Sequence, residues 1–159
     1  MRTPDDSTTP QQRAVLDEIA SNGVHIAHED RSGEQPEYSY TVGMWHSFEQ
    51  PEVIVIGLPR DVAQDLLDNV ADEADGGRRF AAGEQHDGLV HGYPVRLLRV
   101  SEAQAAQWLS LVGWVYERAD VPCVQLVYPD KQGRWPWQPD VREGFRKIQP
   151  VLERAAEAT

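Results

Sequence analysis

The stretch Pro51-Glu52-Val53-Ile54-Val55-Ile56-Gly57-Leu58-Pro59 decides the fold class. Its centre, residues 53–56, consists only of apolar β-branched side chains. Such a run is typical of a strand that is buried on both faces, because a strand with one face in water alternates apolar and polar residues. The sequence therefore predicts a central strand in a sheet that is covered on both sides.

Further helices and strands are predicted on either side of this strand. A helix begins at Thr9 with a capping box, because the Thr9 and Gln12 side chains can each accept the other's backbone N–H. Asn22-Gly23 ends that helix, and a second capping box, Ser101 with Gln104, begins another. The remaining helices are expected at residues 59–72 and 141–149. Strands are expected at residues 24–28, 38–44 and 122–128, two or three times within 78–100, and at 134–138 as a hairpin partner.

These elements do not alternate as regular βαβ units, and long hairpin sections lie between only a few helices. We therefore expect a single α+β domain with a mainly antiparallel or mixed β-sheet and three to four helices. The domain should span residues 9–152. Residues 1–8 are polar and are expected to be a disordered N-terminal tail, and residues 153–159 a frayed C-terminal tail.

Composition and charge exclude several classes of partner. The chain has 159 residues, about one domain, and a formal net charge of −11. A surface this acidic repels phosphate backbones and anionic membranes, so we expect neither nucleic acid nor membrane as a partner. The one cysteine, Cys123, excludes an internal disulfide and a cysteine-based zinc cluster. Without an apolar core in the N-terminal segment, a cytoplasmic localisation is expected.

Common catalytic motifs are missing from the sequence. There is no phosphate-binding loop followed by Lys-Ser or Lys-Thr, and no Gly-x-Gly-x-x-Gly after a strand. A Gly-x-Ser-x-Gly elbow and a His-Glu-x-x-His helix are also absent. These absences argue against ATP hydrolysis of the common kind, dinucleotide binding and the α/β-hydrolase reaction.

The histidines do not form an ordered metal-binding motif. His25 and His28 lie three apart on a predicted strand, so they should point to opposite faces. His86, Asp87 and His91 lie near a glycine-containing loop and would bind a metal only if their side chains converged. We expect solvated or structural histidines, with no metal and no cofactor.

Two residues of the strand at 122–128 have alternative roles. Cys123 is either a small buried hydrophobe or a nucleophile, and an apolar strand favours the first role because burial raises the pKa of a thiol. Gln125 is a mid-strand amide that needs hydrogen-bond partners. It either braces a neighbouring loop or contacts a ligand in a polar part of a pocket.

Aromatic residues follow two of the predicted strands. Trp45 and His46 follow the second strand, and Trp135 and Trp137 follow the turn that contains Asp130. If those strand ends meet, indoles, an imidazole and a carboxylate line one concave edge, as in ligand pockets. The alternative is a small aromatic core under a loop.

Several ordered motifs give the chain a resemblance to a known family. They are Tyr40-Thr41-Val42-Gly43-Met44-Trp45, the stretch 51–59, Gly92-Tyr93-Pro94-Val95, and Gln125-Leu126-Val127-Tyr128-Pro129-Asp130 followed by Gly133 and Trp135-Pro136-Trp137. In this order, from about residue 22 to residue 150, they resemble the bacterial family catalogued as domain of unknown function 4262. The resemblance implies a small bacterial cytoplasmic protein and brings no known activity. Family members often have His immediately before the Pro-Glu pair, where this chain has Gln50.

Three functions compete at this point. In the first, the protein binds a small molecule or short peptide through Tyr40, Trp45, Gln125, Trp135 and Trp137. In the second, it is a modifying enzyme that acts on a peptide or metabolite, with His46 as general acid or base and Asp130 as its partner. In the third, its acidic surface binds a basic protein, as in an interaction or immunity-type module. The sequence also leaves a homo-oligomer open.

Overall fold

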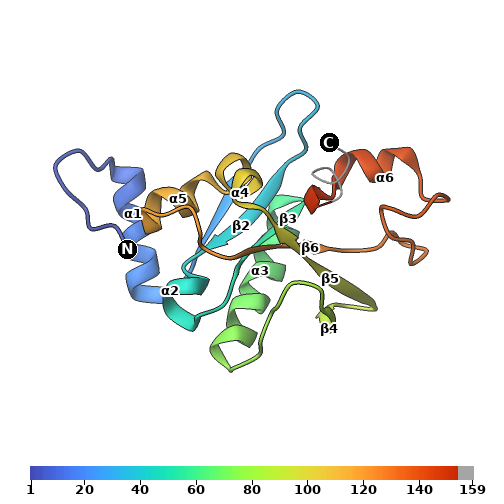
Figure 1. Ribbon diagram of the computed structural model, residues 1–159, viewed down its shortest axis with the longest axis horizontal. Coiled ribbons are helices and arrows are strands. Elements are labelled where there is room, and N and C mark those ends of the chain that lie inside the picture. The colour runs from blue at the N-terminus through green and yellow to red at the C-terminus, as the bar shows by residue number, and fades with distance from the viewer. Residues whose placement is uncertain (154–159) are drawn as a thin grey trace.

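The structure is a computed structural model that describes residues 1–153. The predicted frayed tail lies outside the described residues from position 154 onward. Six strands form one sheet in the order β1-β2-β3-β6-β5-β4 (Figure 1). The strands are β1 (His25–Glu29), β2 (Tyr38–Val42), β3 (Glu52–Ile56), β4 (Gln85–Val90), β5 (Tyr93–Val100) and β6 (Cys123–Val127). The helices are α1 (Pro10–Asn22), α2 (Met44–Phe48), α3 (Arg60–Asp75), α4 (Glu102–Trp108), α5 (Ser110–Tyr116) and α6 (Glu143–Ile148).

The sheet is mixed, and one pair of strands sets its polarity. All neighbouring strands pair antiparallel except β3 and β6, which are parallel. The carboxyl ends of β3 and β6 therefore lie at the same edge of the sheet. Because β2 is antiparallel to β3, the carboxyl end of β2 lies at the opposite edge. The predicted α+β fold with a mixed sheet is confirmed.

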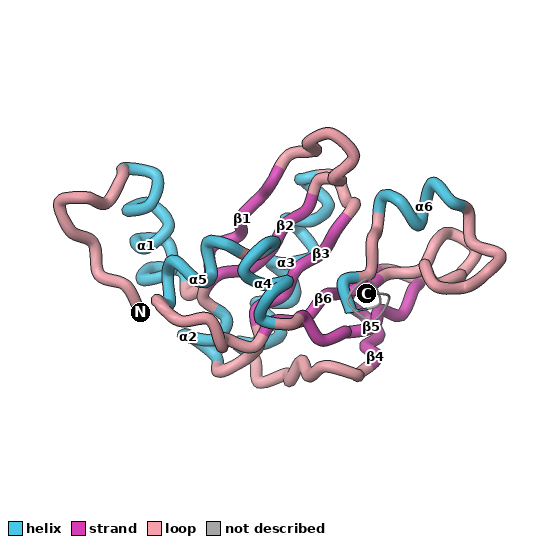
Figure 2. The backbone as a smooth tube through the Cα atoms, turned by 45° about the horizontal axis from the view of Figure 1, so that its top comes forward, coloured by secondary structure: helices cyan, strands magenta, loops and turns pink. Residues whose placement is uncertain are grey.

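Helices cover both faces of the sheet, as the central strand predicted. On one face, α1, α4 and α5 pack against a core cluster that includes Ile54 and Ile56. Helix α3 covers the other face (Figure 2). Its apolar side chains share a core cluster with Val53 and Val55. All four side chains from 53 to 56 are fully buried. Glu52, at the start of the same strand, is also fully buried and is described with the site below.

The predicted start and end of the first helix are confirmed. The Thr9 hydroxyl accepts the Gln12 N–H, and the Gln12 side chain accepts the Thr9 N–H. Gly23 ends the helix with φ of 90°, a left-handed conformation that glycine adopts without steric cost.

Three predicted elements differ from the structure. Strand β2 ends at Val42, because the next backbone N–H groups bond a buried carboxylate and begin α2. The helix that begins after Ser101 breaks at Leu109, where the Leu111 N–H donates to the Tyr40 hydroxyl, and α5 follows as a separate helix. Residues 134–138 form turns in place of the predicted strand, because the chain before them folds back and bonds the Asp130 carboxylate.

Residues 1–8 contact the rest of the domain in this structure. The Arg2 guanidinium lies 4.6 Å from the Trp114 ring centroid, and its Nε donates to the Trp114 carbonyl at 2.8 Å. The Arg2 backbone N–H donates to Val115 O at 2.6 Å. Arg2 thus connects this segment to α5, through Trp114 and Val115. Disorder of residues 1–8 stays a prediction.

Candidate functional site

The predicted composite pocket does not form. Helix α2, with Trp45 and His46, and the loop from β6 to α6, with Asp130, Trp135 and Trp137, lie at opposite ends of the molecule (Figures 1 and 2). The strand directions explain this separation. Since β2 runs antiparallel to β3 and β6 runs parallel to it, the residues that follow β2 and those that follow β6 leave opposite edges of the sheet.

Two of the predicted ligand-binding residues are buried braces. Tyr40 is 1% exposed, and its hydroxyl accepts the Leu111 N–H at 3.3 Å. Gln125 is fully buried, donates to Pro150 O at 2.8 Å and accepts the Leu152 N–H at 2.9 Å. Of the two roles considered for Gln125, the structure shows bracing. The amide ties the segment after α6 to strand β6.

Trp135 and Trp137 form a platform that an arginine of the same chain covers. Their rings are parallel, with centroids 5.4 Å apart. The Arg96 guanidinium lies 5.2 Å from the Trp135 centroid and 5.6 Å from the Trp137 centroid. This cation–π contact fixes the loop against β5, and neither indole lies near Trp45.

His46 and Asp130, the predicted catalytic pair, are held in separate places. The exposed His46 lines a polar cavity of about 680 Å³ with Trp45, Glu49 and Tyr116. Its ring makes no hydrogen bond to another residue among positions 1–153. Asp130 is at the other end of the molecule, so the pairing is wrong.

Asp130 organises the loop in which it lies. Its carboxylate accepts the N–H groups of Gln132 and Arg134 at 2.9 and 2.8 Å, and pairs with Arg134 Nε at 2.9 Å. Desolvation raises the pKa of Asp130, but the hydrogen bonds from Arg134 and Gln132 outweigh it and leave the pKa below its usual value. The carboxylate is therefore ionised and already partnered.

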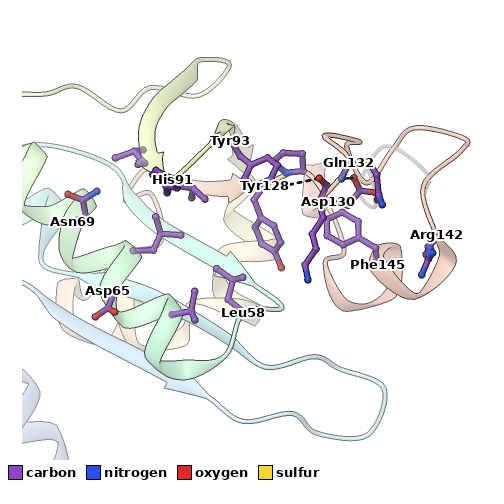
Figure 3. Close-up of a pocket in the computed structure, with 16 residues that line it drawn as sticks. Leu58, Asp65, Asn69, His91, Tyr93, Tyr128, Asp130, Gln132, Arg142 and Phe145 are labelled. Atoms are coloured by element: carbon purple, nitrogen blue, oxygen red, sulfur yellow. Dashed lines mark hydrogen bonds between the residues drawn. The ribbon is translucent and has the colours of Figure 1, made fainter.

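A second cavity, of about 690 Å³, lies where β3 and β6 end. We call it the strand-end cavity. Leu58 follows β3 and Tyr128 follows β6, while α3, the β4–β5 turn and α6 complete the walls (Figure 3). Its apolar lining includes Leu58, Val62, Leu66, Tyr93, Tyr128 and Phe145. Ligand sites in sheets with parallel strands commonly lie outside the carboxyl ends of those strands, which is the position of this cavity.

Tyr128 fixes one wall of the strand-end cavity. Its hydroxyl donates to Ile56 O at 2.9 Å, and its ring meets Phe145 edge-on with centroids 5.8 Å apart. Burial raises the pKa of the Tyr128 hydroxyl, so this group remains a proton donor at neutral pH. The ring is thereby held between the end of β3 and α6.

Gly57 lets α6 reach the end of β3. A Cβ atom at this position would lie 2.3 Å from Ile148 O and 2.9 Å from the Tyr128 hydroxyl oxygen. The φ angle is 91°, which a side chain would also strain. The glycine is thus a steric requirement for the wall formed by α6.

Polar groups stand on two opposite walls of the strand-end cavity. Asp65 and Asn69 lie on α3, and Asp130, Gln132 and Arg142 lie on the side of the β6–α6 loop (Figure 3). Lys131 lines the cavity from the same loop. The arrangement is an apolar floor with charged groups at its ends, which suits a ligand that has both apolar and polar parts.

The buried Glu52 carboxylate is a feature that the sequence-based interpretation missed. It accepts the hydroxyls of Thr41 and Tyr116 at 2.8 and 2.6 Å. It also accepts the N–H groups of Gly43, Met44 and Trp45 at 3.0 to 3.2 Å. Desolvation leaves the pKa of Glu52 above its usual value, although hydrogen bonds to the carboxylate oppose that shift. A glutamate at the head of an otherwise apolar strand was the signal in the sequence.

Glu52 acts as a brace in this fold. Its side chain is fully buried, and all of its neighbours in the network donate to it. The carboxylate satisfies N–H groups at the start of α2 that the helix leaves without partners. It therefore joins β2, β3, α2 and α5 at the edge opposite the strand-end cavity.

A Ser–His pair is present but is closed to substrate. His28 Nδ1 lies 2.7 Å from Ser39 Oγ, and His28 Nε2 lies 2.7 Å from Gln64 Oε1. Ser39 is only 2% exposed. His25, by contrast, contacts Glu18 on α1. The two histidines therefore point to opposite faces of the sheet, as predicted, and His28 links β1 and β2 to α3.

The loop histidines do not converge on a metal site. His86 Nδ1 accepts a hydrogen bond from Arg78 Nε at 3.2 Å, and His86 Nε2 lies 3.1 Å from Glu84 Oε1. The His86 ring also stacks on Phe80. Within residues 1–153, no group of three or more His, Cys, Asp or Glu residues could hold a metal ion. Cys123 is buried, which raises the pKa of its thiol to about 12.

A family model described as domain of unknown function DUF4262 matches residues 18–142, and the chain belongs to this family. Neither the curated proteins nor the solved structures contain a significant match. Within the described part of the chain, no helix has both the length and the apolar character to cross a bilayer.

The motifs that carry the family resemblance divide between two places in the structure. Tyr93, Tyr128, Pro129 and Asp130 line the strand-end cavity. The motifs at residues 40–45 and 51–59 contribute the Glu52 brace at the other edge. Gln50 is 3% exposed, and its side chain accepts the Phe80 N–H at 3.0 Å.

Proposed function

We propose that this protein binds a small organic molecule or a short peptide in the strand-end cavity. The observation that carries the proposal is the position of a mostly apolar hollow of about 690 Å³ at the carboxyl ends of the parallel strands β3 and β6. Cavities for drug-sized ligands have volumes of roughly 300–1,000 Å³. The aromatic lining comes from Tyr93, Tyr128 and Phe145, not from the tryptophans considered first.

An exposed apolar residue at the mouth of the cavity supports this proposal. Val62 lines the cavity and is 46% exposed, whereas the other large apolar residues of α3, Leu66, Leu67 and Val70, are buried. Val62 extends the apolar lining to the mouth of the hollow, and a predominantly apolar lining is typical of small-molecule sites. A ligand would cover Val62 and contact Tyr128 and Phe145 beneath it.

The test uses a neutral fluorescent probe, N-phenyl-1-naphthylamine, whose emission rises in an apolar environment. Val62→Gln removes apolar contact at the mouth while keeping a good helix former at an exposed position. Losing about 1 kcal/mol of apolar contact should weaken probe binding roughly fivefold. Fluorescence titration measures the dissociation constants of both proteins.

Ile148→Gln is the matched control. Ile148 is 44% exposed on α6 and does not line the cavity, so the same chemical change should leave probe affinity unchanged. Melting temperatures establish that both variants fold. Failure of the wild-type protein to bind the probe, or equal weakening by both substitutions, would contradict the proposal.

The other two functions have less support. The enzyme hypothesis loses its acid–base pair, because His46 and Asp130 are at opposite ends of the molecule. The interaction or immunity-type module stays a prediction that rests on the net charge of −11. Bacterial origin and cytoplasmic localisation also stay predictions, as does a homo-oligomer.

A further inference from the structure

We infer that the ligand of the strand-end cavity is an amphipathic anion, with an apolar body and a negatively charged group directed toward the β6–α6 loop. This inference rests on the proposed function and narrows it to a class of ligand. It depends on how the charged side chains are distributed around the cavity.

The cationic groups of the cavity all come from one wall. Lys131 and Arg142 line it from the β6–α6 loop, and both side chains are exposed. Among the residues that the structure describes, neither makes an ion pair. Their charges are therefore available to a ligand at the mouth of the hollow.

The negative charges of the cavity do not cancel these cations. Asp130 lies on the same wall, but its carboxylate is already bonded to Arg134 and to the N–H of Gln132. Asp65 lies on α3, on the opposite wall (Figure 3). The lining also contains His91, in the β4–β5 turn, and the hydroxyls of Tyr93 and Tyr128.

The lining between these walls is apolar, and it favours a ligand whose other end is apolar as well. Leu58 and Leu66 contribute to the apolar lining, and Tyr128 and Phe145 adjoin the loop wall. A ligand that buries an aliphatic or aromatic body there leaves its polar end at the rim. The cations of that rim then favour a carboxylate, sulfonate or phosphate over a neutral or cationic group.

The overall charge of the protein makes this preference testable. A net charge of −11 repels anions from the surface in general. An anionic ligand will bind more tightly than its neutral analogue only where local cations outweigh that repulsion. The comparison therefore reports the local charge of the binding site.

The experiment compares N-phenyl-1-naphthylamine with its anionic counterpart, 1-anilinonaphthalene-8-sulfonate, by fluorescence titration. The wild-type protein should bind the sulfonate more tightly, and added salt should reduce that preference. Lys131→Gln with Arg142→Gln should weaken sulfonate binding on the order of fivefold, since each partly exposed pair contributes about 0.2–1 kcal/mol. Binding of the neutral probe should change less than about twofold.

Arg60→Gln with Lys147→Gln is the control, because it removes the same charge from exposed positions of α3 and α6 that do not line the cavity. This variant should retain the preference for the sulfonate. The inferred ligand class is wrong if the neutral probe binds and the sulfonate binds no more tightly, or if both double variants weaken sulfonate binding equally. Either result would leave the proposal of a ligand site in the cavity intact. If neither probe binds the wild-type protein, the proposed function itself is overturned.

Discussion

Single residues carry the two polar anchors of this fold, Glu52 at one edge of the sheet and Asp130 at the other. Glu52 is fully buried and accepts five hydrogen bonds, so its removal would leave buried donors without acceptors. Glu52→Gln places an amide NH₂ among those donors. We expect a loss of about 3 kcal/mol in the free energy of unfolding, because unsatisfied buried donors each cost about 1–3 kcal/mol.

Chemical denaturation of the two proteins would measure this loss. Glu49→Gln is the matched substitution, since Glu49 is exposed and lies close by in the chain, and it should be nearly neutral. Equal stability of the Glu52 and Glu49 variants would mean that the carboxylate is no brace.

Asp130 gives the loop beside the cavity a dependence on pH. Hydrogen bonds from Arg134 and Gln132 leave its pKa lowered relative to the unfolded chain. A lowered pKa contributes stability that is complete above the unfolded value, about 3.9, and is lost as the pH falls through the folded value. We therefore expect neutral-probe binding to weaken below about pH 4, measured by fluorescence titration at fixed ionic strength.

Asp130→Asn removes the titrating group and should bind the neutral probe less well at neutral pH, with less further loss in acid. Any acid effect on Asp65 or His91 would remain in this variant, which separates those residues from Asp130. An identical acid profile in the two proteins would contradict the assignment to Asp130.

At the scale of elements, the contact between β3 and α6 depends on the absence of a side chain at position 57. Gly57→Ala would place a Cβ atom 2.3 Å from Ile148 O and would strain a φ of 91°. We expect a loss of at least about 2 kcal/mol in unfolding free energy, with displacement of α6 and weaker probe binding. Thermal melting and probe titration measure these two effects.

Gly133→Ala supplies the comparison for Gly57→Ala. Gly133 has φ of 80° and open space around its would-be Cβ atom, so only the conformational cost applies, about 1 kcal/mol. If the two alanine variants were equally stable, the close approach of α6 to β3 would have no energetic role.

Local sequence patterns predicted some of these elements and missed others. The apolar run at 53–56 and the capping box at Thr9 each led to a local prediction that the structure confirms. For Gln125 the sequence predicted only that the amide needs partners, and the structure supplies them at Pro150 and Leu152. Helix α2 and the break at Leu109 were not predictable in this way, because both depend on distant partners, Glu52 and Tyr40. Local propensity does not contain such contacts.

For the whole molecule, the decisive missing information was strand direction. The sequence places tryptophans after β2 and after β6, but only the strand pairing shows that β2 ends at the edge opposite to the one where β3 and β6 end. The cavity that does form joins α3, the β4–β5 turn and the β6–α6 loop, segments far apart in sequence. Its individual residues were visible in the sequence, but their convergence was not.

The central claim is that the hollow at the ends of β3 and β6 is a ligand site, and a crystal structure with N-phenyl-1-naphthylamine tests it most directly. The probe should lie between Val62 on α3 and Phe145 on α6, with its rings against Tyr128. A probe bound instead beside His46, or on the stacked pair Trp135 and Trp137, with the strand-end cavity holding only water, would contradict the account.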